Sequence, residues 1–446
     1  MNSAVAVRTG FLLARCIGFA IRGLRAVGIR QWRNQQVIVP PSGWGSVGDE
    51  AMLTFVVGSA SDRRLPGSVI LQGSHGTSWA GRLSLIDGNC YAAEMTRSHR
   101  RLPLRGLISA MRSISSAKEL VIIGADVIDG TYGNTTSLSR LLLAEMACAS
   151  GLKVTFTGFS FSARATPESV EGFRLLSPSA ELSCRDPVSA KRFQAATGRD
   201  IRLSADLAFL AGRFARQSAG VAASADHAPR PDTARIGITL NHHALGRRHD
   251  GSLVDPRDYV KSTVDGLSLW SKKSGLKSIA VLPVPSDNRD PNEPQSDYGL
   301  CRLLAKALQD EAWAEVVAPV QPMTLASMQQ TLRPLDFLVS GRMHACILAL
   351  NEGVPILAVE YAGKFRGMMD QFSSGDVGVL LSPEQFLQPE LLSDALAQTW
   401  ERKLQLRSAI ATGIGAVRDR AESGFLISRT DGGKPDENLP AGKICR

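Results

Sequence analysis

Short apolar runs alternate with longer segments of helical pattern from residue 37 onward. Runs of this length, rich in β-branched residues and separated by helix-length segments, favour parallel strands joined by helical crossovers. The stretch at 213–234, rich in Ala, Ser, Pro and Arg, interrupts the alternation and divides the runs into four and four. The predicted strands are Val37–Val39, Val69–Leu71, Leu120–Ile123 and Val154–Phe156 before the interruption, and Ile236–Leu240, Ile279–Leu282, Phe337–Val339 and Ile356–Val359 after it.

This alternation predicts an α/β protein with two domains. A chain of 446 residues with 44% hydrophobic content exceeds the ~250–300 residues at which single cores stop growing. Its 6% aromatic content and 41 glycines suit alternating strands and helices better than a β-sandwich. We expect a parallel-sheet domain at 35–212, a linker at 213–234 and a second such domain at 235–427. The last segment, 428–446, has turn residues and little to bury, which predicts a disordered tail.

The positive charge is concentrated near the N-terminus. The 51 basic and 42 acidic residues give a net charge of +9, and six of the basic residues are arginines at positions 8, 15, 22, 25, 30 and 33. No acidic residue precedes Asp49, and nine less six leaves only +3 on the rest of the chain. The charge therefore predicts a basic N-terminal segment at 1–34 and does not imply a nucleic-acid-binding face.

Residues 8–33 have the pattern of a helix with its arginines mostly on one side, because spacings of seven and eleven residues return to the same face. No run reaches ~18 uninterrupted apolar residues and Arg15 interrupts the apolar stretch, so we expect neither a membrane span nor a signal-peptide core. Three interpretations stay open: an interfacial membrane helix, a targeting peptide and an ordinary surface helix.

The cysteines indicate the compartment. The seven are odd in number and scattered, and they form neither a CxxC pair nor a cluster with metal-ligand spacing. We therefore expect the cysteines to be buried and to act as small apolar residues, in a protein of the reducing cytoplasm. Within that compartment, the basic N-terminal segment is a candidate for peripheral contact with the inner face of the membrane.

The first stretch that could carry chemistry is 37–53, in which an apolar strand runs into a Gly-rich turn and then into a helix. Gly43, Gly45 and Gly48 permit close approach of the backbone, and the free amides at the helix start can donate to a phosphate or carboxylate. Asp49 opens the helix and is either its N-cap or a functional acid.

The second stretch, 337–364, has a strand, a Ser-Gly turn, a helix with Arg342 and His344, and a second strand followed by Lys364. Open parallel sheets bind ligands beyond the carboxyl ends of their strands, where helix N-termini add partial positive charge. These basic groups therefore predict an anion site. Alternatively, Arg342 pairs with a neighbouring carboxylate and His344 is a structural histidine.

Two further stretches place polar residues after predicted buried strands. Residues 121–133 combine glycines with polar residues, which gives the backbone room beside a cleft between the domains. Arg185 stands before a predicted helix. It either reaches a ligand or pairs with Asp186 or Asp206.

In this order, these stretches resemble the polysaccharide pyruvyl transferase family over approximately residues 37–375. The family's Gly-Asn-x-Gly-Asp loop and glycine-rich strand end are matched with departures, since Ser46 replaces Asn and Ala125-Asp126 replaces glycines. Its other elements are complete: Arg185-Asp186-x-x-Ser189, Ala205-Asp206, the Ser-x-Arg-x-His signature at Ser340, Arg342 and His344, and then Gly353-Val354-Pro355, Tyr361 and Lys364.

The resemblance implies two Rossmann-like domains facing a cleft, similar to GT-B glycosyltransferases. It also implies phosphoenolpyruvate as the donor and an exopolysaccharide or cell-wall glycan as the acceptor of a pyruvyl ketal. Arg342 and Lys364 would hold the carboxylate and phosphate of the donor, and His344 or Asp49 would transfer protons, in a reaction that needs no metal. The remaining expected substrate-binding residues are Gly45, Gly48, Ser340, Arg185 and Tyr361.

Two other functions fit parts of the sequence. A GT-B glycosyltransferase that uses a nucleotide sugar would also bind phosphate between the domains, but no acidic motif in the second domain is placed to hold a ribose. A noncatalytic glycan-binding or assembly protein would tolerate the departures at Ser46 and Ala125-Asp126. A screen of donors separates the three.

Overall fold

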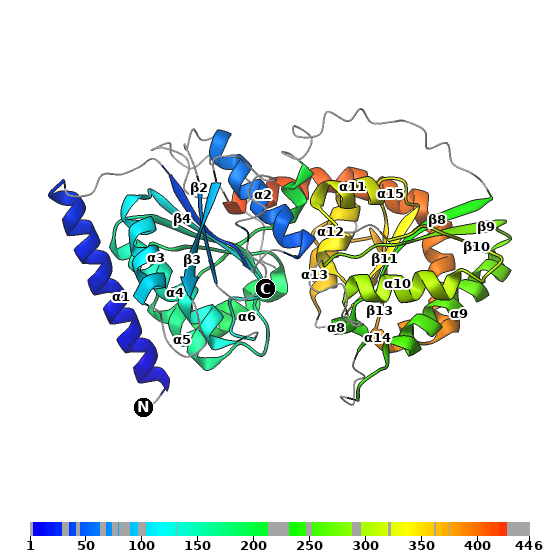
Figure 1. Ribbon diagram of the computed structural model, residues 1–446, viewed down its shortest axis with the longest axis horizontal. Coiled ribbons are helices and arrows are strands. Elements are labelled where there is room, and N and C mark those ends of the chain that lie inside the picture. Colours follow the sequence, from blue (N-terminus) through cyan, green and yellow to red (C-terminus); the bar gives the residue numbers. More distant parts are fainter. Residues whose placement is uncertain are drawn as a thin grey trace.

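The computed structural model describes residues 3–28, 35–41, 45–62, 68–73, 79, 90–96, 104–131, 133–212, 232–246, 252–287, 296–319, 323–360, 363–373 and 375–425. These residues form two lobes, each built on a parallel sheet covered by helices (Figure 1). The predicted linker lies outside the described residues up to position 231, and the predicted tail at 428–446 lies wholly outside them.

The first lobe contains a seven-stranded sheet in the order β3-β2-β1-β4-β5-β6-β7 among the described residues. Its central strands are buried on both faces, as expected for a parallel sheet that has helices on both sides. The strands are β1 (Gln36–Val39), β2 (Ser68–Gly73), β3 (Cys90–Thr96), β4 (Glu119–Ala125), β5 (Lys153–Phe159), β6 (Glu181–Cys184) and β7 (Arg202–Leu203). The helices are α2 (Val47–Asp62), α3 (Leu104–Ser116), α4 (Asn134–Ala149), α5 (Pro167–Leu175), α6 (Pro187–Thr197) and the 3-10 helix η3 (Leu207–Leu210).

The second lobe contains a six-stranded sheet in the order β10-β9-β8-β11-β12-β13. The strands are β8 (Thr233–Thr239), β9 (Ser278–Pro283), β10 (Ala314–Val316), β11 (Phe337–Ser340), β12 (Ile356–Val359) and β13 (Gly378–Leu381). The helices are α8 (His242–Leu245), α9 (Pro256–Ser274), α10 (Asp297–Leu308), α11 (Leu325–Leu332), α12 (Met343–Asn351), α13 (Lys364–Met369) and α14 (Pro383–Phe386).

The last helix, α15 (Pro389–Phe425), packs against both lobes (Figure 1). Its first half buries Leu392 and Leu396 in the core of the second lobe. Its last residue, Phe425, stacks edge-on against Phe55 of α2 with ring centroids 5.2 Å apart, and Arg418 donates to the carbonyl of Phe209. The chain therefore returns to the first lobe after completing the second.

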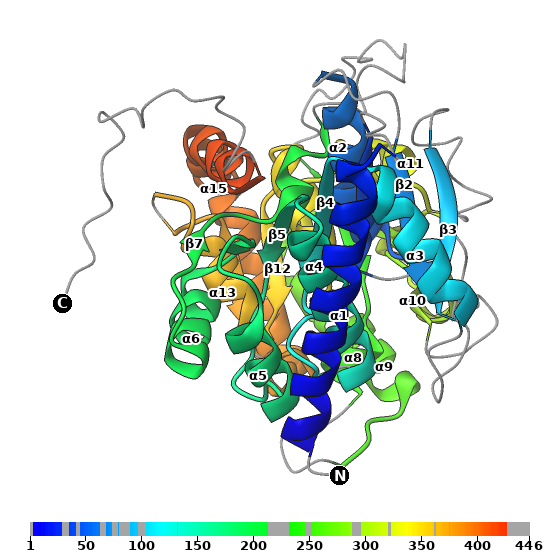
Figure 2. The same ribbon diagram turned by 90° about the vertical axis from the view of Figure 1, so that its left-hand side faces the viewer.

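The N-terminal helix α1 (Ser3–Ala26) lies along the outside of the first lobe and packs against α4 and α5 (Figures 1 and 2). Val7, Phe11, Ala14, Gly18 and Ile21 form its buried face, and they recur at the three- and four-residue spacing of one helix side. The helix predicted at 8–33 thus begins earlier, at residue 3, and ends at residue 26; residues 29–34 lie outside the described part of the chain.

The arginines of α1 do not form the unpaired cationic face that the sequence suggested, because several are bonded to the first lobe. Arg8 pairs with Glu171 at 2.9 Å and Arg15 with Glu145 at 2.5 Å, while Arg25 donates to backbone carbonyls of the lobe. By length and hydropathy alone, this 24-residue helix could cross a membrane, since the mean hydropathy of its most apolar window is 1.7. Its inner face is instead bound to the lobe.

Candidate active site

Counted from the first strand of each sheet, both sheets have the order 3-2-1-4-5-6, to which the first sheet adds β7 as a seventh strand at its edge. In this doubly wound arrangement ligands bind beyond the carboxyl ends of the two strands at which the order reverses. Those strands are β1 and β4 in the first lobe and β8 and β11 in the second. The residues that follow them, together with those after β6, β7 and β12, meet where the lobes face each other.

Ser340 and Arg342 form the turn between β11 and α12. The Ser340 hydroxyl accepts a hydrogen bond from the Arg342 amide at 3.0 Å, so this buried serine shapes the turn. The Arg342 guanidinium donates through Nε and Nη2 to both carboxylate oxygens of Asp297, at 2.7–3.2 Å. Asp287, which follows β9, lies 3.8 Å from the same guanidinium. The alternative interpretation, in which Arg342 pairs with a carboxylate, thus describes the structure without a ligand.

His344, on the first turn of α12, faces the first lobe. Its Nε2 lies 3.4 Å from Oδ2 of Asp206, which is long for a hydrogen bond. The two groups form an ion pair when the imidazole is protonated. On its other side, the ring lies against Gly48 in the first turn of α2. The approach is so close that a Cβ added to Gly48 would overlap the ring atoms. Gly48 therefore gives His344 its space, through close approach and without an unusual backbone conformation.

Asp206 connects His344 with Arg185. Its carboxylate accepts from Arg185 Nη1 at 2.6 Å and from the Ala208 amide at 2.9 Å, and Arg185 also donates to Ser160. Burial alone would raise the pKa of Asp206, but the charges of His344 and Arg185 outweigh it and hold this pKa well below its usual value. Asp206 is therefore a carboxylate at neutral pH. Of the partners proposed for Arg185, Asp206 is the one found.

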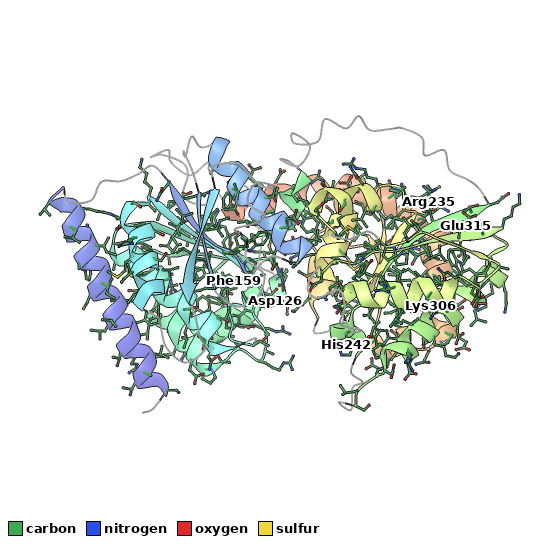
Figure 3. The ribbon with its side chains drawn as sticks, viewed as in Figure 1. Asp126, Phe159, Arg235, His242, Lys306 and Glu315 are labelled. Carbon is green, nitrogen blue, oxygen red and sulfur yellow. The ribbon has the colours of Figure 1, made fainter. Side chains whose placement is uncertain are left out.

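Lys364 and Asp126 form an ion pair between the lobes, at 2.5 Å. Burial alone would raise the pKa of Asp126, but the positive charges of Lys364 and Arg185 outweigh burial and lower this pKa to about 2. The preceding residue, Ala125, has φ 46° and is the only non-glycine with positive φ among the described residues. Such backbone costs ~1–3 kcal/mol and concentrates at functional sites. Figure 3 shows Asp126 on the side of the first lobe that faces the second.

The first turn of α2 begins at Ser46, which departs from the asparagine that the resemblance led us to expect. Its hydroxyl accepts from the Asp49 amide at 3.3 Å, so Ser46 is the N-cap and Asp49 stands in the third helical position. Asp49 is buried near Arg140. Burial of Arg140 lowers the pKa of its guanidinium to about 10, and the negative charge of Asp49 partly opposes this shift. Gly45 has φ 142°, a conformation that favours glycine.

In the Arg-Asp-x-x-Ser element, Arg185 belongs to the site and Asp186 caps a helix. Arg185 turns toward Asp206, whereas Asp186 caps α6 by accepting from the amide and hydroxyl of Ser189 at 2.7 and 2.6 Å. Gln371 of the second lobe donates to the Arg185 carbonyl at 2.5 Å. A small cavity between the lobes is lined by Arg185, Asp206, Met343, Lys364, Met368 and Gln371.

The structure brings together four of the predicted site residues, Arg185, His344, Lys364 and Gly48, around Asp126 and Asp206. Ser340 and Arg342 form the turn before His344, and the Arg342 guanidinium is held by Asp297 of the second lobe. Gly45 is placed one residue before the start of the turn that holds Gly48, and Tyr361 lies outside the described residues. The sequence offered Asp206 as a partner of Arg185, but it did not assign Asp206 to His344, Asp126 to Lys364 or Asp297 to Arg342. For Asp126, its position directly after the predicted strand that became β4 was a usable signal.

This arrangement has a definite chemical capacity. Each carboxylate keeps a neighbouring cation charged and fixes its orientation, which is the preorganisation that an anion-binding catalytic site needs. His344 is the group among them whose usual pKa suits proton transfer near neutral pH. The site can therefore hold an anionic substrate and exchange a proton with it.

Comparison with solved structures defines the class of protein. UDP-GlcNAc 2-epimerase from Neisseria meningitidis, bound to UDP-GlcNAc, matches with a TM-score of 0.53 and 12% identity over 88% of this chain and 99% of that one. UDP-GlcNAc 2-epimerase from Methanocaldococcus jannaschii matches with a TM-score of 0.53 and 11% identity over 88% and 99%. At this identity the likeness shows the fold alone, a GT-B-like pair of Rossmann-like lobes. No curated protein sequence matches significantly.

The sequence profile of one family resolves the class further. It matches residues 89–363, which is more than half of the chain and includes the Ser-x-Arg-x-His signature. This protein belongs to the polysaccharide pyruvyl transferase family.

Proposed function

We propose that this protein transfers the pyruvyl group of phosphoenolpyruvate to two hydroxyls of a saccharide, as a cyclic ketal. The observation that carries the proposal is the meeting of Arg185, His344 and Lys364 around Asp126 and Asp206, with Arg342 on the turn just before His344. Two cations suit a donor with a carboxylate and a phosphate, and a histidine suits a reaction that begins with protonation. Membership of the family supports the same reaction.

We assign the donor carboxylate to Arg342, whose planar guanidinium is already oriented by Asp297 and is 21% exposed. The phosphate then pairs with Lys364 and takes the place of Asp126. Arg342 keeps Asp297 and Lys364 exchanges Asp126 for the phosphate, so neither cation is left unpaired. The amides of Val47, Asp49 and Glu50 at the start of α2 already donate to Ser286 and Ser46, so Gly45 and Gly48 are assigned the shape of this turn and not an amide contact with the donor.

His344 is the proposed proton donor, and Asp49 is the second candidate. The reaction balances when a proton is added to the enol methylene and one sugar hydroxyl attacks the central carbon. A second hydroxyl then displaces phosphate. Of the two hydroxyl protons released, one returns to His344 and the other leaves with the phosphate. Asp206 stabilises the protonated imidazole during this cycle.

We place the reaction in the cytoplasm, in exopolysaccharide or cell-wall glycan synthesis, with a saccharide acceptor that can be lipid-linked. The scattered cysteines and the donor, a metabolite of the cytoplasm, support this location.

The test is incubation of the full chain with phosphoenolpyruvate and a panel of glycans, while free phosphate and a new ketal methyl signal in the NMR spectrum are followed. We expect both to appear together with one class of acceptor and to be absent with UDP-sugars. Transfer of a sugar from a UDP-sugar, with no ketal from phosphoenolpyruvate, would overturn the proposal in favour of a glycosyltransferase. Tight phosphoenolpyruvate binding without turnover on any glycan would favour a noncatalytic role.

A further inference from the structure

The side of α1 that points away from the first lobe has an apolar surface. At ~100° per residue, its large side chains spread over about 140° of the helix circumference, opposite the buried face. We call these residues the outer strip; they are 44–64% exposed and comprise Val5, Leu12, Leu13, Phe19 and Leu24. Figure 2 views the molecule from the side on which α1 lies in front of the lobe.

The charges of α1 lie beside the outer strip and not on it. Arg8, Arg15 and Arg22 fall on one flank at spacings of seven residues, whereas Arg25 lies on the buried face. Arg8, Arg15 and Arg22 are all exposed, but Arg8 and Arg15 also pair with Glu171 and Glu145 of the lobe. The surface that α1 presents is therefore mainly apolar, with a single cationic edge.

An apolar groove follows the other flank of α1, where the helix meets α4. Its volume is about 210 Å³, and Val7, Gly10, Phe11, Leu138 and Leu142 contribute most of its lining. A groove with so few polar atoms suits a hydrocarbon chain better than a charged group. It lies next to the outer strip and widens the apolar surface on this side of the lobe.

We propose that the outer strip docks the protein on the surface of a lipid bilayer, with α1 parallel to the membrane. A helix of 24 residues offers a line of contact ~36 Å long at ~1.5 Å per residue. Charge decides between a membrane and a second copy of the chain. No acidic residue precedes Asp49, so α1 of another copy offers no counter-charge to Arg22, whereas anionic headgroups do.

The inner face of α1 determines how the test is designed. Removal of residues 1–33 would expose the lobe core around Phe11 and leave Glu145 without Arg15, so a truncated chain would report loss of folding. Substitutions confined to the outer strip avoid this. We choose Leu12→Gln with Leu13→Gln and Phe19→Gln, which changes exposed side chains only.

The control carries Leu253→Gln and Leu404→Gln, at apolar residues of the second lobe that are 70% and 74% exposed. Both variants and the natural chain are sedimented with vesicles of phosphatidylcholine, alone and mixed with phosphatidylglycerol. We expect the natural chain and the control to bind, more strongly to the mixed vesicles. The triple variant should lose roughly tenfold or more in the ratio of bound to free protein, since burial of apolar side chains drives the contact.

All three proteins should melt at the same temperature and release phosphate from phosphoenolpyruvate equally with a soluble acceptor, which separates this proposal from the proposed function. Failure of the natural chain to bind either vesicle, or equal binding by the triple variant, would overturn it. A dimer that the triple variant dissociates, without vesicle binding, would assign the outer strip to a second copy and also overturn it.

Discussion

Replacement of Gly48 by alanine tests whether the first turn of α2 holds His344 in place. An added Cβ would lie 2.1 Å from Cγ and Nδ1 of the His344 ring, whereas ordinary van der Waals contact begins at 3.4 Å. Gly48 has no positive φ, so alanine suits its backbone, and the imidazole is the nearest obstacle. The ring or the helix must therefore move by at least 1.3 Å, the difference between these two distances.

The magnitude follows from that displacement. A misplacement of ~1 Å at a reacting group costs about 100-fold in rate, and overpacking of this kind costs ~1–3 kcal/mol of stability. We expect Gly48→Ala to fold, to bind phosphoenolpyruvate within a few-fold of the natural chain and to lose about 100-fold in kcat. The assay is phosphate release with a saturating acceptor, beside donor titration and urea unfolding.

Two controls make the outcome decisive. Gly415→Ala, in α15, meets no atom within 4 Å and should leave kcat unchanged while raising stability slightly. In a His344→Gly background the three nearest atoms, Cβ, Cγ and Nδ1 of His344, are all absent, so Gly48→Ala should add no further loss of kcat or stability. A normal kcat in Gly48→Ala, or an equal loss in both backgrounds, would refute the idea that Gly48 acts through His344.

Three further predictions concern the charged groups. His344→Gln should lower kcat more than donor affinity, because glutamine keeps size and polarity but cannot exchange a proton; phosphate release beside a donor titration measures both. Arg342→Lys keeps the charge but loses the planar fork that Asp297 orients, so donor affinity should fall by roughly 1.5–3 kcal/mol in a binding titration. Asp206→Asn leaves the buried Arg185 without its carboxylate and should cost ~3–5 kcal/mol of unfolding free energy at pH 7. Because folding lowers the pKa of Asp206, that difference is complete above about pH 4 and should shrink on acidification, as urea unfolding at several pH values would show.

The strands that the sequence predicted and those it missed differ in their place in the sheets. All eight predicted strands occur, at β1, β2, β4, β5, β8, β9, β11 and β12. Of the five missed, β3, β7, β10 and β13 are the sheet edges. Interior parallel strands are buried on both faces and become continuous apolar runs, whereas β7 has two residues and β10 three. Short edge strands leave little pattern to detect.

The site shows a similar division. Arg342, His344 and Lys364 could be found because they follow apolar strands in one compact motif. Their partners could not be assigned, since Asp126 and Lys364 are 238 positions apart and a single sequence contains no signal for such pairing. The prediction of a cationic face on the N-terminal helix was incomplete for the same reason, because Arg15 pairs with Glu145 only when α1 packs against α4.

Two of the carboxylate contacts also join the lobes, which links donor binding to their relative position. Lys364 and His344 belong to the second lobe, while Asp126 and Asp206 belong to the first. If the donor phosphate replaces Asp126 at Lys364, as we propose, a direct tie between the lobes is exchanged for a tie through the ligand. The apolar contacts of α15 with both lobes remain. The strained backbone at Ala125 is then understandable, because it aims a carboxylate at the cation that the donor must reach.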